Sequence, residues 1–254
     1  MTELFSGGSA VSPQQEIIVK KKSTRIIAPP LDPYYDIENK YEISIDESGR
    51  GPMFGRLYVA ACILPKTGFR HEDMKDSKKI KSKKKMKKLA DYIKTNSISW
   101  HITYMEASRI DELNILQANM FAMHECIANI ITKMKCNIVD FKDYMLLIDG
   151  NYFKPFSMFD EKTELIYSLR YETIEQGDNK YSGIAAASIL AKDARDQYIE
   201  DLCKQYPELI TRYSLNTNEG YGTKAHMEGI NEHGITQWHR RSFGCCKTAR
   251  VNPL

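Results

Sequence analysis

The chain has no uninterrupted apolar stretch that approaches the length of a membrane span. Its first residues, MTELFSGGSAVSPQQ, also lack the basic and then apolar pattern of a secretory signal. These two absences predict a cytoplasmic protein that is neither secreted nor inserted in a membrane. With 42% hydrophobic and 27% charged residues among 254, the chain has the composition of a soluble globular protein that can bury a core.

Cysteine is scarce, and its spacing argues against a structural zinc site. None of the six cysteines lies in a CxxC pair that is matched by a second pair or by histidines at zinc spacing. In an intracellular protein of this size we expect them to be reduced and mostly buried. They are Cys62, Cys126, Cys136, Cys203, Cys245 and Cys246.

The order of the elements predicts an α/β domain with a helical C-terminal region. Residues 1–40 show no sustained periodicity and are expected to form a flexible extension, so the catalytic domain spans 41–254 and its helical part starts near 206. Strands are expected at 41–46, 57–64, 97–105, 145–148 and 169–174. Helices are expected at 82–96, at 113–134 as one long helix, at 182–205 and at 223–234. We find no internal repeats.

Two of the buried strands end in acidic residues. The first ends at Asp46 and Glu47, and a later one ends at Asp149. Carboxylates at the ends of neighbouring strands repel one another unless a cation lies between them, and oxygen ligands favour Mg²⁺ or Mn²⁺ over zinc. Alternatively, one acid caps a helix or meets an arginine while the other is exposed. The acids alone leave both interpretations open.

An arginine between two glycines follows the first pair of acids. In Gly49-Arg50-Gly51 the glycines allow the backbone to approach a ligand closely, and the guanidinium of Arg50 is suited to phosphate. Such a tripeptide is usually just a turn. Beside a metal site, it suggests a place where a sugar–phosphate backbone lies.

Six blocks of the sequence resemble, in the same order, the motifs of the ribonuclease HII family. The first block has a serine at position 48 where the family has alanine, and Arg50 distinguishes it from the sister family, ribonuclease HIII. Together the blocks cover about residues 41–244. They are Asp46–Pro52, Asp76–Lys79, Leu147–Gly150, Gly183–Lys192, Gly220–Lys224 and His239–Phe243. The resemblance implies a ribonuclease H-like α/β fold with a mixed central sheet flanked by helices.

The resemblance also implies four catalytic carboxylates that hold two Mg²⁺ or Mn²⁺ ions. The fourth of these follows Gly177, shortly before the alanine-rich helix, whereas Asp193 and Asp196 lie past the matching position. Asp193 departs from the family pattern and is expected to be exposed. The four carboxylates are Asp46, Glu47, Asp149 and Asp178.

Recognition of the substrate is assigned in the same way. In the family, the backbone of Gly49-Arg50-Gly51 senses the 2′-hydroxyl that distinguishes RNA from DNA, and Tyr221 packs on the sugar of the following deoxyribonucleotide. Without the resemblance, Tyr221 reads as a core tyrosine in a Gly-Tyr-Gly turn.

The alanine-rich helix adds a geometric hypothesis. Ser188, Lys192 and Arg195 are spaced four and three residues apart, so they share one helix face. A hydroxyl and two cations among small residues could cradle phosphate. A solvated polar face with an Arg–Asp pair is the competing interpretation.

Eight lysines between positions 78 and 88 form the strongest basic feature. Lys78 and Lys79 fall in a family motif and are expected to approach the duplex, while the others point all round a helix. They predict a salt-dependent, nonspecific contribution to nucleic-acid binding. A nuclear-targeting signal or an ordinary solvated face remains the alternative.

The function implied is a metal-dependent endoribonuclease that acts as a monomer on RNA–DNA hybrids. It would also incise duplex DNA 5′ of single embedded ribonucleotides, by a two-metal mechanism that leaves 5′-phosphate and 3′-hydroxyl ends. Two alternatives are an integrase or resolvase on the same fold and a nucleic-acid-binding protein with weak catalysis. Four clustered carboxylates argue against the second, because without metal they hinder the binding of a polyanion.

Overall fold

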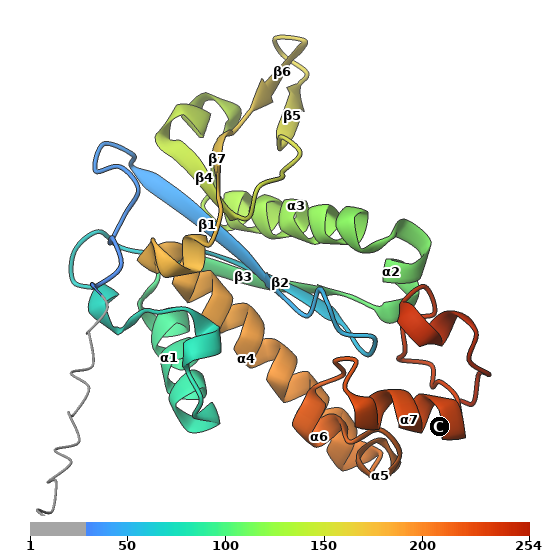
Figure 1. Ribbon diagram of the computed structural model, residues 1–254. Helices are drawn as coiled ribbons and strands as arrows, with labels where there is room; N and C mark the ends of the chain where they lie inside the picture. Colours follow the sequence, from blue (N-terminus) through green and yellow to red (C-terminus); the bar gives the residue numbers. More distant parts are fainter. Residues whose placement is uncertain (1–28) are drawn as a thin grey trace, which may run out of the picture.

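The computed structural model describes residues 29–254, which form a five-stranded mixed sheet with helices on both faces (Figure 1). The strand order is β3-β2-β1-β4-β7. At its centre, β1 (Tyr41–Ser48) pairs antiparallel with β2 (Leu57–Ile63), which pairs antiparallel with β3 (Ser99–Met105). On its other side β1 pairs parallel with β4 (Tyr144–Asp149), which pairs parallel with β7 (Arg170–Ile174). The predicted fold class, an α/β domain with a mixed sheet, is confirmed.

Two layers of helices sandwich this sheet (Figure 1). Helix α3 (Ile115–Lys133) packs on one face, where Ile43 and Ile45 of β1 are fully buried. On the opposite face lie α1 (Lys83–Asn96) and α4 (Ser182–Gln205). Since side chains alternate along a strand, Asp46 points away from the α3 face, toward α4.

Helix α4 lies close to the sheet because its contact face is built from small residues. Ala185, Ala186, Ala187 and Ala191 are fully buried against the sheet and α1. At Gly183 the approach is closer still, since a Cβ there would overlap the side chain of Ser44 on β1. The predicted bounds of this helix, 182–205, are confirmed.

The long helix expected at 113–134 is confirmed as α3 (Ile115–Lys133), but a short helix directly before it was not predicted. Asn114 has a φ of 65° and separates α2 (Ala107–Leu113) from α3. Its side-chain oxygen accepts hydrogen bonds from the N–H groups of Leu116 and Gln117, at 3.0 and 3.1 Å. Asn114 therefore caps α3, an effect that the spacing of apolar residues does not reveal.

A projecting hairpin was also not predicted. Strands β5 (Ser157–Asp160) and β6 (Leu165–Ser168) form a separate two-stranded sheet that projects beyond the start of β7 (Figure 1). Most of their residues are exposed, including Phe159 and Ile166. Strands that bury neither face show no alternation of apolar and polar residues, so the sequence gives no signal for them.

The C-terminal region packs as a third layer against one end of α4 and the loop between β1 and β2. It contains α5 (Glu208–Tyr213), α6 (Leu215–Asn218) and α7 (Lys224–His233). Phe54 from the β1–β2 loop is fully buried among these elements. The predicted limits of α7 are confirmed, because Thr223 caps its start and Gly234 follows its end.

Five short 3-10 helices complete the described elements. The second and the fourth lie beside the candidate site. Their bounds are His71–Asp73, Ser77–Lys79, Ile138–Asp143, Gly177–Asn179 and Gly244–Lys247.

Most of the predicted extension, residues 1–28, lies outside the described residues, and its flexibility stays a prediction. The part that follows is attached to the domain. Asp32 forms a bridge with Tyr181, and the carbonyl oxygen of Pro33 accepts a hydrogen bond from Ser182 at 3.0 Å. Within 29–254, no helix combines the length and apolar character that a membrane crossing requires.

The close packing of α7 on α5 gives a stability prediction. A Cβ at Gly229 would overlap the carbonyl group of Arg212, whose carbon would lie 3.0 Å away. In an exposed helix, glycine to alanine stabilises by about 1 kcal/mol. At this site we expect Gly229→Ala to destabilise the fold by about 1–3 kcal/mol, because the helices must separate. Urea denaturation measures the change. Asn231→Ala, exposed on the same helix, is the control, and equal effects of the two substitutions would contradict the packing argument.

Candidate active site

The sheet brings the predicted acids to one edge. Ile45 pairs with Ile148, so Asp46 and Asp149 lie at the same end of the adjacent parallel strands β1 and β4. Asp178 lies in the 3-10 helix between β7 and α4, and the N–H of the preceding Gly177 donates to Asp149 Oδ1 at 2.7 Å. Glu47 follows Asp46 on β1. Four carboxylates from three separate segments of the chain therefore cluster at one site.

Burial and mutual repulsion make this cluster unfavourable for negative charge. Asp46 is only 4% exposed, and burial raises its pKa well above the ordinary value, with Glu47 and Asp149 adding to the effect. Burial also raises the pKa of Asp178, again with a contribution from Asp149. The pKa of Glu47 is raised by burial, although Asn119 and Arg50 oppose the shift. Within the cluster, the negative charges are therefore not fully compensated by positive charge.

Two cations lie at the rim of the cluster. The Lys78 ammonium is 3.6 Å from Asp178 Oδ2, and the Arg50 guanidinium is 3.6 Å from Glu47 Oε1. Burial alone would lower the pKa of Lys78, but the surrounding carboxylates, Asp178 foremost, raise it. Both cationic side chains are more than half exposed, so each supplies only partial compensation.

One buried acid near the site was missed from the sequence. Asp76 is 7% exposed, and its side chain caps the 3-10 helix that carries Lys78 by accepting from that residue's N–H at 2.9 Å. It also contributes to the raised pKa of Asp178. Its place at the start of the Asp76–Lys79 block was the signal, since aspartate commonly caps a short helix.

The oxygen ligands that these residues offer fit a hard divalent cation, although the carboxylates now accept hydrogen bonds from groups of the protein. Within residues 29–254, no three acidic, histidine or cysteine side chains are already arranged to hold a metal ion. Asp149 accepts from Gly177, Asp46 accepts from the N–H of Glu47 at 2.7 Å, and Asp178 accepts from Asn179 at 3.1 Å. All four groups offer only oxygen ligands, which Mg²⁺ and Mn²⁺ prefer, and such an ion would relieve the repulsion among the carboxylates.

The Gly49-Arg50-Gly51 turn rests on two buried arginines. Gly49 has a φ of +92°, and a Cβ there would overlap the side chain of Arg195, whose Cδ would lie 2.6 Å away. Arg240 donates to the carbonyl oxygens of Gly49, at 2.6 Å, and Arg50, at 3.1 Å. Both arginines are at most 1% exposed. The side chain of Arg50 and the backbone of Gly51 stay at the surface.

Tyr221 lies beside this turn. Its side chain is 49% exposed, which excludes the alternative of a core tyrosine. A Cβ at Gly51 would lie 3.6 Å from Tyr221 Cε1, so the ring lies beside the turn, where a side-chain carbon on residue 51 would touch it. The structure therefore brings together the two elements that the sequence assigned to recognition of the sugar.

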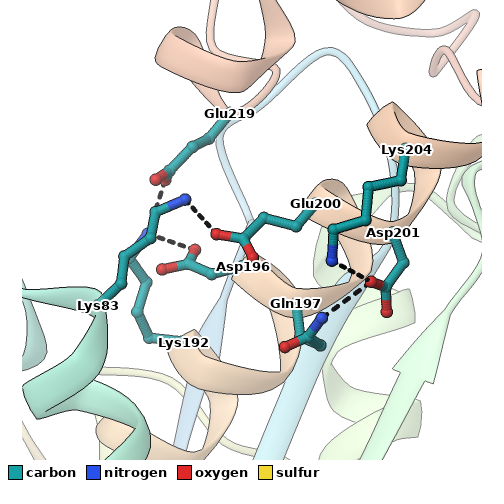
Figure 2. A network of polar contacts seen from close by, with 8 residues as sticks. All are labelled: Lys83, Lys192, Asp196, Gln197, Glu200, Asp201, Lys204 and Glu219. Carbon is teal, nitrogen blue, oxygen red and sulfur yellow. Dashed lines mark hydrogen bonds and ion pairs between the residues drawn. The ribbon is translucent and has the colours of Figure 1, made fainter. Parts of the chain in front are cut away.

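The three residues on α4 do not form one exposed phosphate cradle. Ser188 is 4% exposed and bonds to Ser77 at 2.9 Å, and it also lowers the pKa of Asp46 against the larger effect of burial. Figure 2 shows the ammonium of Lys192 between Asp196 and Glu219, each at 2.6 Å. Arg195 lies under Gly49. The shared face was predicted correctly, but helical spacing does not tell that it is buried.

The lysine-rich segment 78–88 shows the expected mixture of roles. Lys79 bonds to Asn179, next to the acids, while Lys83 is paired with Glu200 in the network of Figure 2. Asp193, which was expected to be exposed, has a side chain only 12% exposed and lies 3.8 Å from Lys94. That expectation was wrong, because α4 packs against α1 at this point.

Comparisons with known proteins agree with this geometry. The family model described as Ribonuclease HII matches residues 43–246. A ribonuclease HII of Parabacteroides distasonis is 39% identical over 84% of this chain and 94% of its own length. The RNase HII in a PCNA complex from Archaeoglobus fulgidus has a TM-score of 0.58 at 24% identity, over 80% of this chain and 95% of its own.

A third similar protein is Bst-RNase HIII, whose structure was determined in complex with Mn²⁺. It has a TM-score of 0.57 at 12% identity and is aligned over 84% of this chain and 70% of its own, a likeness of fold alone. The family model spans most of the chain, and the bacterial relative is matched over nearly its full length. This chain therefore belongs to the ribonuclease HII family and is a metal-dependent endoribonuclease of the ribonuclease H type.

Proposed function

We propose that this enzyme cuts the RNA strand of RNA–DNA hybrids and incises duplex DNA 5′ of single embedded ribonucleotides, leaving 5′-phosphate and 3′-hydroxyl ends. The observation that carries the proposal is that two elements lie side by side next to the buried acids. The exposed ring of Tyr221 lies 3.6 Å from where a Cβ of residue 51 would be, and the turn that holds Gly51 follows Asp46 and Glu47 along the chain.

The carboxylates Asp46, Glu47, Asp149 and Asp178 are the proposed ligands of two Mg²⁺ or Mn²⁺ ions. When bound, such ions activate a water molecule and stabilise the leaving oxygen of the phosphodiester. Asp46 would be the central ligand of the set, because it is buried and both Glu47 and Asp149 raise its pKa. Asp149 and Asp178 accept from Gly177 and Asn179 through Oδ1, so the second oxygen of each carboxylate could serve an ion while these hydrogen bonds persist.

The chain's own residues account for the choice of substrate. We assign the ribose 2′-hydroxyl to the backbone of Gly49-Arg50-Gly51, where no side chain beyond that of Arg50 obstructs approach. Tyr221 would lie against the sugar of the next nucleotide, where an added hydroxyl fits poorly. Discrimination between RNA and DNA then depends on how closely the turn and the ring are held.

Phosphates of the duplex are assigned to cations at the surface. Lys78, Lys79 and Arg50 border the acid cluster and are exposed. Of the three residues on α4, Lys192 alone keeps an exposed fraction of about a fifth, and a phosphate there would compete with Asp196 and Glu219. Ser188 and Arg195 would not touch the phosphates. Ser188 would position Asp46, and Arg195 would support the turn at Gly49. The enzyme is proposed to act as a monomer.

The first test is incision of a DNA duplex that carries one ribonucleotide, with Mg²⁺ or Mn²⁺. We expect a single cut 5′ of that residue, and Asp46→Asn should abolish the cut while duplex binding stays measurable. Gel electrophoresis resolves the products, and a binding assay follows the variant. Glu161→Gln, an exposed change in the hairpin, should leave incision intact. Absence of incision with either ion would refute the proposal.

A second test concerns the cost of the unliganded cluster. Because the pKa of folded Asp46 is raised, ionisation destabilises the fold as pH rises above 3.8, the ordinary pKa of aspartate. In a chelator at neutral pH, Asp46→Asn should therefore increase the free energy of unfolding by about 1–3 kcal/mol. The gain should shrink as pH falls toward the ordinary pKa. Urea denaturation across pH measures it. A loss of stability at neutral pH would show that Asp46 is not under repulsion.

A further inference from the structure

A chain of hydrogen bonds runs from the backbone of Tyr221 into the C-terminal region. The Tyr221 carbonyl oxygen is 2.9 Å from His226 Nδ1, and His226 Nε2 is 3.1 Å from His239 Nε2. His239 Nδ1 is in turn 2.9 Å from the N–H of Thr236. His226 and His239 are at most 1% exposed, so water does not compete with these bonds.

The two ends of this chain specify the same tautomers. The backbone N–H of Thr236 can only donate, so His239 Nδ1 must be unprotonated and its proton lies on Nε2. That proton is donated to His226 Nε2, which leaves the proton of His226 on Nδ1. The Tyr221 carbonyl can only accept, and it receives this proton. The Thr236 hydroxyl, also 2.9 Å from His239 Nδ1, can donate there as well.

The residue after His239 holds the other substrate-reading element. Arg240, fully buried, donates to the carbonyl oxygens of Gly49 and Arg50 and to that of Gly55 at 3.0 Å. Its own N–H donates to the Met53 carbonyl at 2.8 Å. The dipeptide His239-Arg240 thus binds both elements. Arg240 forms hydrogen bonds to the turn directly, and His239 is connected to Tyr221 through His226.

The β1–β2 loop forms backbone hydrogen bonds with both of these segments. The N–H of Met53 donates to the Gly220 carbonyl at 2.9 Å, and Phe54 forms a backbone bridge with His239. The loop therefore lies between the segment that carries Tyr221 and the segment that carries Arg240. The placement of Gly51 relative to Tyr221 is therefore held on both sides by buried hydrogen bonds, which exposed side chains alone would not provide.

We infer that His226, His239 and Arg240 are positioning residues that set the gap between Gly51 and Tyr221, and with it the preference for a ribonucleotide followed by a deoxyribonucleotide. The inference rests on the proposed function of the turn and of Tyr221. None of the three touches the acid cluster through a hydrogen bond within the described residues, so their effect is on substrate choice more than on cleavage itself.

The test compares two substrates in each variant. We expect His226→Leu to lower the ratio of incision at a single ribonucleotide to cleavage of a continuous RNA–DNA hybrid by about tenfold, the effect of one buried hydrogen bond. His226→Asn keeps a donor near the position of Nδ1 and should restore most of the ratio. His124→Leu, whose ring bonds only to the Lys154 carbonyl, is the matched control. Circular dichroism confirms that each variant is folded.

An equal fall on both substrates, or an unchanged ratio, would overturn the inference. Nitrogen-15 NMR of the histidine rings gives an independent readout, with a proton expected on Nδ1 of His226 and on Nε2 of His239. The opposite tautomers would refute the chain of hydrogen bonds from Tyr221 to Thr236, whatever the activity. This readout tests the inference even if His226→Leu does not fold. Failure of the unmodified enzyme to cut either substrate would instead refute the proposed function.

Discussion

The burial of like charges at the ends of β1 and β4 is the constraint on which the rest of the site depends. Asp46 is almost inaccessible to water, yet it lies next to Glu47 and Asp149. Removing carboxylates from water without a counter-ion is costly. The surrounding structure reduces the cost with backbone N–H groups, Ser188 and an ammonium at the rim, but none of these matches a divalent cation. The fold thus leaves a concentration of negative charge uncompensated at the place where we propose that the phosphodiester binds.

Positive charge is buried on the other side of the same loop. Arg195 and Arg240 lie under the Gly49-Arg50-Gly51 turn, and burial lowers the pKa of each. Their guanidinium groups donate to backbone carbonyls in place of carboxylates. This use of arginine fixes the path of an exposed turn from below. The surface left for the substrate is backbone together with the ring of Tyr221.

Sequence reasoning placed Asp46, Glu47 and Asp149 at strand ends because strands follow from local patterns, whereas Asp178 was assigned through the family resemblance alone. Apolar runs that end in Asp46 and Asp149 predict strands, and parallel pairing then brings their ends together. It could not place Arg195, because spacing along a helix gives a face but not what covers that face. It also missed the short helix α2, which ends just before Asn114, and the exposed hairpin. His226 and His239, which are thirteen residues apart in the sequence, form their hydrogen bond only in the folded chain.

The most direct test of the metal site is the melting temperature as a function of Mn²⁺ concentration. A cation that binds only the folded cluster should raise it progressively in the unmodified enzyme. Asp149→Asn removes one ligand and should flatten that rise at the same concentrations, while leaving the chelator-treated protein folded. An equal rise in both proteins, or no rise in either, would contradict the assignment of the four carboxylates to metal.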